Sequence, residues 1–243
     1  MWMFSLQRRY LHFSLCLMKK LKGKTPAEQR WLRRQLKDPY VKASQVQNFR
    51  CRSAFKLLEI DDKFRLLQPG YTVVDCGAAP GAWSQVAVQR VNSGVTGERT
   101  DPELPRGMVV GIDLLNIPPL DGAHFLSNCD VTDPATHAKL LELLPHGKAH
   151  VILSDMAPNA SGFREMDHEK LITMCLSLID LAEKILQPQG SLLCKYWDGI
   201  LAHKLQETLS SVFSSVRTLK PDSSRKDSAE RYFLARMYRR PIK

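Results

Sequence analysis

The chain has 243 residues, a formal net charge of +10 and a hydrophobic fraction of 44%. This composition is typical of a globular protein and argues against intrinsic disorder. No window reaches the roughly 18–20 apolar residues that would span a bilayer. The six cysteines are scattered without a C-x-x-C pair, so we expect neither a disulfide framework nor a metal site.

The charge is distributed unevenly along the chain. Residues 1–24 carry six Lys/Arg and no acid, residues 25–66 have a net charge of +5, residues 67–215 of −7 and residues 216–243 of +6. An acidic centre suits a cationic ligand, and basic flanks suit a phosphate backbone. From charge alone, an ordinary solvated surface is an equally good interpretation.

The first 24 residues mix Phe, Leu and Ser with basic side chains. This composition resembles a mitochondrial presequence, and we expect it to direct import into the matrix and to be cleaved. Two other interpretations stay open. Leu11–Met18 could be the apolar region of a secretory signal, although a clear A-x-A cleavage site is missing, and the whole segment could be a basic RNA-binding arm.

Two helices are expected ahead of the core. Residues 26–38 have a proline in their first turn, and residues 53–67 begin at Ser53, a plausible N-cap. We expect residues 25–66 to form a basic helical segment and 67–243 the core, with 25–243 acting as one monomeric domain. Candidate RNA contacts in this segment are Arg33, Arg34 and Arg52.

Strands and helices alternate through the rest of the chain. The expected strands are 71–74, 107–115, 124–126, 149–153, 190–197, 216–220 and 231–238, and the expected helices are 82–91, 134–144, 167–186 and 200–213. Repeated strand–helix units predict a mostly parallel sheet with helices on both faces. Only a short polar segment joins the last two strands, so we expect them to be antiparallel neighbours.

The stretch Tyr71–Gln85 reads Y-T-V-V-D-C-G-A-A-P-G-A-W-S-Q, a strand, a turn of small residues and the start of a helix. Small residues let the backbone approach a ligand, and a helix start presents unpaired N–H groups to an anion. The G-x-x-x-G spacing differs from the dinucleotide-binding fingerprint. A turn without a ligand remains the alternative.

Four acids follow the expected strands: Asp75, Asp113, Asp130 and Asp155. Ligands of open α/β sheets gather at the carboxyl ends of the strands, and an acid after the second strand typically accepts the ribose hydroxyls of an adenosine cofactor. Any one of these acids could be a solvated carboxylate. Four at successive strand ends favour a shared ligand.

The sequence D-C-G-A-A-P-G-A-W-S-Q resembles motif I of the FtsJ/RrmJ family, the heat-shock-type 2′-O-ribose RNA methyltransferases, with Ala82 where the family usually has glycine. The resemblance implies a Rossmann-like methyltransferase fold, α/β, with a seven-stranded, mostly parallel sheet whose last strand is antiparallel. It also implies that the turn cradles the methionine part of S-adenosyl-L-methionine and that Asp130 contacts the adenine. The cofactor-binding residues would be Gly77, Ala79, Pro80, Gly81, Ala82, Trp83, Asp113, Asp130 and Asp155.

The Lys-Asp-Lys-Glu tetrad of that family has a match in this chain. The matching residues are Lys56 in R-S-A-F-K-L, Asp155 in L-S-D-M-A-P-N, Lys195 in L-L-C-K and Glu230 in S-S-R-K-D-S-A-E-R-Y. Singly, each could be a surface lysine, a strand-end side chain or an edge residue. The four motifs in family order, beside motif I, favour the tetrad.

Methyl transfer to a ribose requires the 2′-OH to lose its proton. We expect Lys195 to contact the 2′-oxygen, either as a base or as a cationic donor to the developing alkoxide. Asp155 would orient Lys195, while Lys56 and Glu230 would complete the network and hold the ribose. The D-M-A-P-N turn also differs from the N/D-P-P-Y/F motif of amino-group methyltransferases, which favours an oxygen acceptor.

Taken together, the resemblance implies 2′-O-methylation of a uridine in mitochondrial large-subunit rRNA, in support of ribosome assembly. The expected partner is that rRNA or a pre-ribosomal particle. Two alternatives stay open. One is a tRNA 2′-O-methyltransferase with the same tetrad, and the other is an rRNA-binding assembly factor whose catalysis is incidental.

Overall fold

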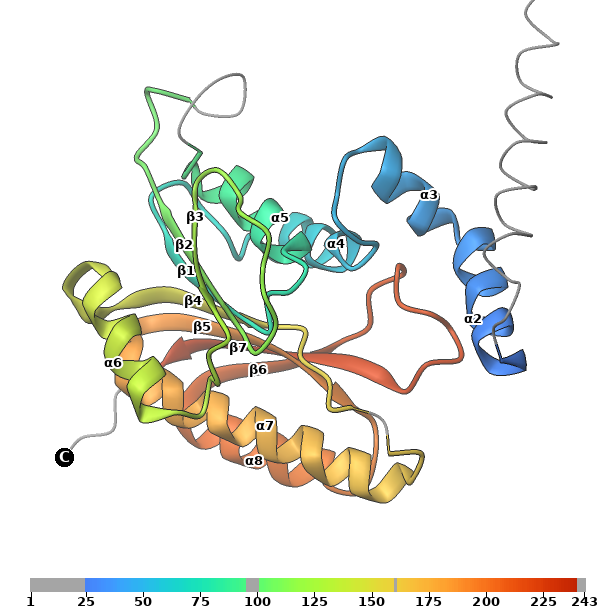
Figure 1. Cartoon of the computed structure of the whole chain (residues 1–243). Helices are drawn as coiled ribbons and strands as arrows, with labels where there is room; N and C mark the ends of the chain where they lie inside the picture. Colours follow the sequence, from blue (N-terminus) through green and yellow to red (C-terminus); the bar gives the residue numbers. More distant parts are fainter. Residues whose placement is uncertain (1–24, 95–100, 160, 240–243) are drawn as a thin grey trace, which may run out of the picture. The chain divides into compact units, whose positions relative to one another are not determined.

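A computed structural model of the chain describes residues 25–94, 101–159 and 161–239 (Figure 1). The expected presequence, residues 1–24, lies outside the described residues. The chain divides into two compact units, Met1–Asn48 and Phe49–Lys243. Among the residues that the structure describes, none of the helices could serve as a membrane span.

The described part of the first unit contains the two helices α2 (Pro26–Lys37) and α3 (Pro39–Val46). Helix α2 agrees with the predicted helix to within one residue. Helix α3 was not predicted, although the Asp-Pro pair before it is a recognised start signal. Asp38 caps this helix by accepting a hydrogen bond from the Tyr40 amide at 3.0 Å, and Pro39 occupies its first turn.

The second unit is built on one seven-stranded sheet (Figure 1). Its strands are β1 (Thr72–Cys76), β2 (Met108–Asp113), β3 (Ala123–Ser127), β4 (Ala149–Ser154), β5 (Leu186–Trp197), β6 (Phe213–Leu219) and β7 (Glu230–Tyr238). They lie in the order β3-β2-β1-β4-β5-β7-β6. The first five are parallel neighbours, and β7 is antiparallel to both β5 and β6. The predicted fold class is therefore confirmed.

Helices cover both faces of this sheet (Figure 1). Those of the second unit are α4 (Ala54–Phe64), α5 (Ala82–Val91), α6 (Pro134–Leu143), α7 (Arg164–Ile185) and α8 (Ala202–Val212), with a short 3-10 turn at Pro145–Gly147. One buried apolar cluster joins α4 and α5 to the sheet, and a second joins α6, α7 and α8 to it. Since strand side chains alternate between faces, the central strands contribute to both clusters.

Helix α4 differs from its prediction at both ends. Ser53 precedes the helix but makes no capping bond, because its hydroxyl contacts the Cys51 thiol at 3.0 Å. The helix ends at Phe64, since Arg65 adopts a left-handed conformation and Asp61 accepts the Leu67 amide at 2.7 Å. The helix packs within the second unit, so the compact core begins at Phe49. Whether residues 25–243 act as one domain stays a prediction.

The strand directions decide where functional side chains meet. The parallel strands β1, β2, β4 and β5 all end at one edge of the sheet. Because β7 is antiparallel to β5, it begins at that edge, and its first residue, Glu230, pairs with Trp197, the last residue of β5. The ends of four strands and the start of a fifth therefore surround one region.

Candidate active site

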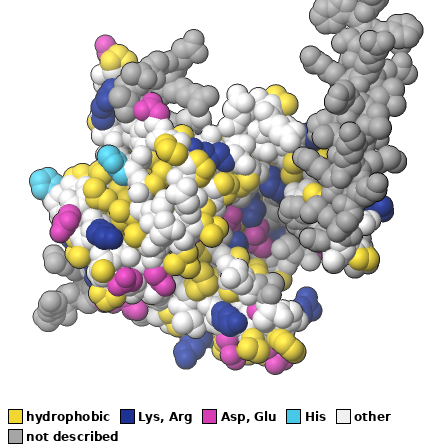
Figure 2. Space-filling view, in the orientation of Figure 1, with side chains coloured by type: hydrophobic (Ala, Val, Ile, Leu, Met, Phe, Trp, Pro, Cys, Tyr) yellow, Lys and Arg dark blue, Asp and Glu magenta, His cyan; other side chains and the backbone are white. Residues whose placement is uncertain are grey.

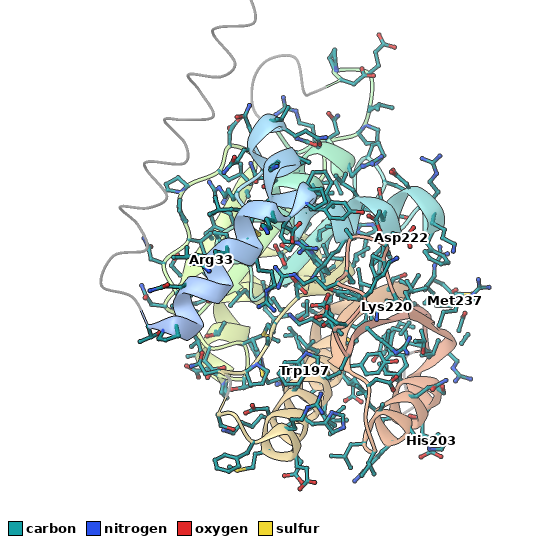
Figure 3. All side chains as sticks on the ribbon, turned by 90° about the vertical axis from the view of Figure 1, so that its right-hand side faces the viewer. Arg33, Trp197, His203, Lys220, Asp222 and Met237 are labelled. Carbon is teal, nitrogen blue, oxygen red and sulfur yellow. The ribbon has the colours of Figure 1, made fainter. Side chains whose placement is uncertain are left out.

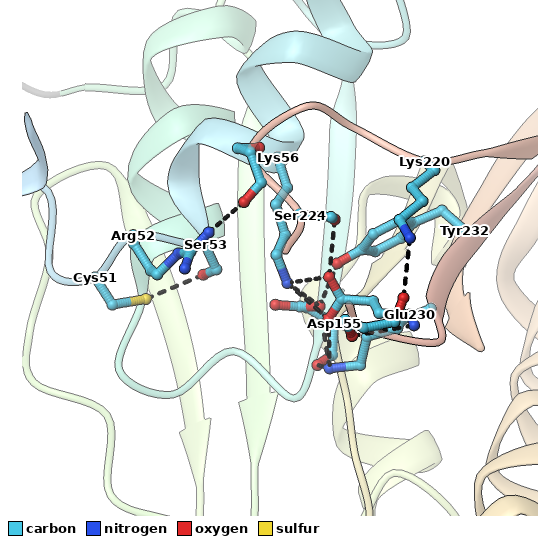
Figure 4. A network of polar contacts seen from close by, with 12 residues as sticks. Cys51, Arg52, Ser53, Lys56, Asp155, Lys220, Ser224, Glu230 and Tyr232 are labelled. Carbon is cyan, nitrogen blue, oxygen red and sulfur yellow. Dashed lines mark hydrogen bonds and ion pairs between the residues drawn. The ribbon is translucent and has the colours of Figure 1, made fainter. Parts of the chain in front are cut away.

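The four tetrad residues come together at this edge of the sheet. Figure 4 labels three of them, Lys56, Asp155 and Glu230. Ser154 pairs with Cys194, so the following residues, Asp155 and Lys195, lie side by side at the ends of β4 and β5. Glu230 opens β7, and Lys56 reaches the same place from the first turn of α4. The structure thus brings together all four residues that the sequence motifs identified.

The contacts form a closed network of two cations and two anions. Lys56 Nζ lies 2.7 and 2.8 Å from the two carboxylate oxygens of Glu230 and 3.6 Å from Asp155 Oδ1. Lys195 Nζ lies 3.2 Å from Asp155 Oδ1 and 3.9 Å from Glu230 Oε2, and it donates to the Asp155 carbonyl oxygen at 2.6 Å. Both lysines are buried, and burial is tolerated because each charge has an opposite partner.

Two residues that sequence reasoning missed complete the network. The Tyr232 hydroxyl donates to Asp155 Oδ1 at 2.7 Å, and the Ser224 hydroxyl donates to Glu230 Oε1 at 2.9 Å. Tyr232 pairs with Lys195 across β5 and β7, and it lies two residues after Glu230, so both point to the same face of β7. This spacing of two is the signal that could have identified the tyrosine.

The network fixes the charge of Asp155. Burial alone would raise the pKa of this carboxyl, but Lys195 and Lys56, together with the Tyr232 hydroxyl, hold it below its ordinary value. Burial and the neighbouring Asp155 and Glu230 raise the pKa of Tyr232 well above the usual range. Asp155 is therefore an anion at neutral pH, and Tyr232 is a neutral donor.

The small-residue turn Gly77–Gly81, called the cofactor turn below, lies next to the tetrad. A Cβ atom at Gly77 would come within 2.3 Å of Met156, which directly follows Asp155. Gly77 and Gly81 have φ angles of 76° and 105°, which side chains rarely permit. The glycines therefore allow both the tight turn and its close approach to the loop that carries Asp155.

The predicted cofactor-binding acids have different surroundings. Asp113 accepts the Ala79 amide at Oδ2 and the Leu115 amide at Oδ1, both at 2.8 Å, so it joins the cofactor turn to the loop after β2. Asp130 accepts the amide and the hydroxyl of Thr132 at 2.8 Å. Asp113 thus lies beside the turn, whereas these side-chain bonds of Asp130 are within its own loop.

Asp75, at the end of β1, is almost completely buried, with 1% of its surface exposed. Its Oδ2 accepts a hydrogen bond from the Ser84 hydroxyl of α5 at 2.7 Å. Burial, and more weakly the charges of Asp155 and Asp113, raise the pKa of Asp75 to about 7. This carboxyl carries a proton for part of the time at neutral pH.

These features fit S-adenosyl-L-methionine. The cofactor turn is built of small residues that let a ligand approach the backbone, and the α5 helix begins directly after Gly81, with amides that can meet a carboxylate. Asp113 retains lone pairs for hydroxyl groups beside its two amide partners. Trp83, predicted at the same site, is buried, and its ring lies 5.8 Å from that of Tyr232.

The three arginines predicted to bind RNA lie in both units. Arg33 and Arg34 are exposed on α2, and Arg33 is labelled in Figure 3. Arg52 precedes α4 and donates to the Ser223 carbonyl in the segment between β6 and β7. On the face seen in Figure 2, Lys and Arg side chains occur in separate groups. RNA contact by these three residues stays a prediction.

The mostly parallel sheet, the small-residue turn after β1 and the adjacent lysine–carboxylate network are features expected of the Rossmann-like methyltransferase class. Comparison with known proteins extends this result. A model of the FtsJ-like methyltransferase family matches residues 49–238. The chain therefore belongs to the FtsJ-like methyltransferase family, as the resemblance of motif I and the tetrad predicted.

Individual relatives agree with this placement. The chain is 44% identical to the Drosophila melanogaster protein named "rRNA methyltransferase 2, mitochondrial", over 90% of this chain and 86% of that protein. It is 42% identical to "Ribosomal RNA large subunit methyltransferase E" of Ruegeria pomeroyi, over 91% of this chain and 93% of that protein. A crystal structure of a Plasmodium falciparum protein that is named as a ribosomal RNA methyltransferase matches this chain with a TM-score of 0.67 and 26% identity, over 78% of this chain and 98% of that one.

Proposed function

We propose that this protein methylates a ribose 2′-hydroxyl in large-subunit ribosomal RNA, using S-adenosyl-L-methionine as the methyl donor. The closed network of Lys56, Asp155, Lys195 and Glu230 beside the cofactor turn carries this proposal. The names of the Drosophila and Ruegeria relatives support rRNA as the substrate. By analogy with the family, the modified nucleotide is a uridine.

The residues that would hold the cofactor surround one edge of the sheet. They are Gly77, Ala79, Pro80, Gly81, Ala82 and Trp83 of the turn and the start of α5, with Asp113, Asp130 and Asp155 from neighbouring strand ends. When bound, the sulfonium supplies an electrophilic methyl group. The protein's task is to bring the ribose oxygen into line with that group and to manage its proton.

Lys195 is the residue proposed to act on the 2′-oxygen. Its ammonium group is held by the Asp155 carbonyl oxygen and carboxylate. Its N–H groups can therefore point in only a few directions. A lysine held in this way can donate to an oxygen that develops negative charge, or accept its proton when deprotonated. Lys56 and Glu230 would neutralise each other and hold the ribose.

The residues around Asp155 support an oxygen acceptor over a nitrogen acceptor. The cationic donors Lys195 and Lys56 lie beside this carboxylate, whereas the single hydroxyl hydrogen of Tyr232 is already donated to it. Cationic donors stabilise an alkoxide. An amino group, in contrast, needs acceptors to orient its N–H bonds.

We further propose that the protein acts in the mitochondrial matrix. Relatives from Drosophila melanogaster and Caenorhabditis elegans are named as mitochondrial, and the first 24 residues are basic and free of acid. Fusing residues 1–30 to a fluorescent protein should send the reporter to mitochondria. Diffuse cytosolic fluorescence would contradict the targeting role.

Ribose-methylation mapping of mitochondrial rRNA, in cells with and without the protein, tests the proposed function. One 2′-O-methylated position in large-subunit rRNA should disappear without the protein and return with the intact chain. Mapping tRNA in the same samples tests the alternative substrate. A missing tRNA methyl group with unchanged rRNA would overturn the proposal.

The alternative role as an assembly factor requires a separate experiment. Cells that express only Lys195→Ala retain the protein but should lack the methyl group. If large subunits assemble normally in these cells, the presence of the protein rather than its chemistry supports assembly.

A further inference from the structure

Arg50 lies just before α4 and contacts two different loops of the candidate active site. Its Nη1 atom donates to the carbonyl oxygens of Pro80 at 2.9 Å and Pro118 at 2.7 Å, and its Nη2 atom donates to that of Pro119 at 2.5 Å. Pro80 belongs to the cofactor turn, and Pro118 and Pro119 belong to the loop between β2 and β3. One guanidinium therefore connects the loops that follow the first two strands.

The position of Arg50 is itself fixed by α5. Its backbone amide donates to Gln85 Oε1 at 2.7 Å, and the Trp83 indole donates to the Ser53 carbonyl oxygen at 2.9 Å. Both ends of the segment Arg50–Ser53 are thus bound to the helix that begins at the cofactor turn. The guanidinium extends from a rigid support.

Gly81 provides the space that Arg50 occupies. A Cβ atom at Gly81 would lie 2.4 Å from Arg50 Nη1, and the glycine has a φ of 105°. The carbonyl of Pro80 can therefore meet the guanidinium directly. The cofactor turn and the arginine fit one another at this point.

The connected loops are those that would contact opposite halves of the cofactor. The cofactor turn lies on the methionine side, and the loop after β2 begins at Asp113, which is proposed to accept the ribose hydroxyls. We propose that Arg50 is a positioning residue that sets the separation of these two loops and thereby preorganises the site for a ligand that spans both. This inference rests on the proposed use of S-adenosyl-L-methionine.

The chemistry of the side chain explains why an arginine is needed. The planar guanidinium can serve several acceptors in fixed directions at once, whereas a lysine ammonium is a compact charge on a flexible stem. For the loss of the Arg50 charge, simple electrostatics and the positioning role predict opposite effects on cofactor affinity. Removing a cation near a cationic sulfonium would strengthen binding, whereas breaking the connection between the loops would weaken it.

Calorimetric binding to the full chain can test this role with three ligands. S-adenosylmethionine and S-adenosylhomocysteine span both loops, whereas 5′-methylthioadenosine lacks the amino-acid half. Arg50→Lys and Arg50→Gln should weaken binding of the two spanning ligands about 10-fold, as expected for removal of one or two hydrogen bonds made by a charged group. Binding of 5′-methylthioadenosine should change less than about 3-fold, which is within about 0.7 kcal/mol.

The matched control is Arg106→Gln, at an exposed arginine in the loop before β2, which should leave all three affinities unchanged. Thermal unfolding checks that each variant is folded, and Arg50→Lys, which keeps the charge, serves if Arg50→Gln is unstable. Unchanged affinity of Arg50→Lys for the spanning ligands would overturn the proposal. So would equal losses of affinity for all three ligands, which would indicate general destabilisation.

Two further outcomes are informative. Weaker binding of an rRNA fragment with unchanged S-adenosylhomocysteine affinity would make Arg50 a phosphate-binding residue and overturn its positioning role. A wild-type chain that binds none of the three ligands would refute the proposed function itself. Failure of the positioning role alone leaves wild-type binding intact, so the two failures are distinguishable.

Discussion

The two halves of the candidate active site are constructed in different ways. The cofactor half consists largely of main chain: a turn of small residues, the start of α5, and a carboxylate, Asp113, bound to backbone amides. The tetrad half consists of side chains from four separate segments that neutralise one another. The first is shaped by backbone conformation and the second by charge, so substitutions should affect them differently.

Two aspartates on neighbouring strands illustrate this difference. Asp75 and Asp155 lie at the ends of the adjacent strands β1 and β4, yet their pKa values move in opposite directions. Asp75 is hydrogen-bonded to the Ser84 hydroxyl, a neutral partner that does not offset its burial. Asp155 is held by two lysines, which outweigh its burial. Local partners, and not the strand end itself, decide the charge.

The largest expected effect is on the tetrad half. Lys195→Ala should lower the methylation rate about 10²–10⁴-fold, the usual contribution of a positioned acid–base or electrostatic group. Cofactor affinity should change far less, because the lysine belongs to the tetrad. Single-turnover methylation of an rRNA fragment and calorimetry measure the two quantities. Near-normal methylation by Lys195→Ala would remove this residue from catalysis.

Lys195→Arg separates the two proposed roles of the lysine. Arginine keeps the positive charge but cannot act as a base. If the lysine must accept the proton, Lys195→Arg should lose about as much activity as Lys195→Ala. If the lysine acts only as a cationic donor, Lys195→Arg should retain more activity than Lys195→Ala.

The next effect concerns Asp75 and the pH dependence of stability. An unfolded aspartate has a pKa of about 3.9, and the folded value is about 7. Because the folded chain retains a proton that the unfolded chain releases, stability is lost as pH rises from about 4 to about 7. At about 1.4 kcal/mol per pKa unit, this loss is at most about 4 kcal/mol.

Asp75→Asn removes this titration while keeping an acceptor for Ser84. Relative to wild type, the variant should therefore gain free energy of unfolding as pH rises through this window, as urea unfolding from pH 4.5 to 8 would measure. The pKa of Asp155 is held below its ordinary value, so this carboxyl titrates below the pH window of the experiment. Ser84→Ala, which removes a donor to the charged form, should extend the wild-type loss of stability to higher pH. Parallel curves for wild type and Asp75→Asn would contradict the assignment.

A smaller effect is expected at Asp113. Asp113→Ala should weaken S-adenosylmethionine binding by about 1–3 kcal/mol, the cost of removing a partly buried hydrogen-bonding group. Asp113→Asn keeps one acceptor oxygen and should be intermediate. The methylation rate at saturating cofactor should change little, because the tetrad is untouched. Unchanged affinity in calorimetry would remove Asp113 from the cofactor half.

The smallest effect is expected outside both halves. Changing Arg33, Arg34 and Arg52 to alanine should weaken RNA binding and flatten its salt dependence, by about one unit of slope for each phosphate that is no longer bound. Single substitutions separate the exposed pair on α2 from Arg52, which has a carbonyl partner. An unaltered salt slope would place the RNA elsewhere.

The cofactor half and the sheet could be predicted well from the sequence because their signals are local. The strand, turn and helix of residues 71–91 form one contiguous stretch, and the short segment between the last two strands predicted their antiparallel pairing. The tetrad could be identified only through resemblance to a family, because its members lie far apart in the chain. Their contacts depend on the pairing of β4, β5 and β7.

The residues that were missed make contacts whose partners cannot be read from the sequence. The bond between Tyr232 and Asp155 joins residues 77 positions apart and follows from a strand register. Arg50 binds main-chain carbonyl groups, which every residue possesses. Helix ends were also imprecise, since α4 stops where a side chain, Asp61, takes over an amide.

The position of β7 has a consequence for how the enzyme acquires its activity. This strand is the last of the described strands, yet it lies inside the sheet, between β5 and β6. The cofactor turn and three tetrad residues have already been synthesised by residue 197, but Glu230 and Tyr232 join only when β7 pairs with β5 and β6. Because chains fold from the N-terminus as they emerge, a chain that stops before residue 230 would keep the cofactor turn and lack the complete network. If the complete network is needed for catalysis, we expect a chain that ends before β7 to lack methylation activity.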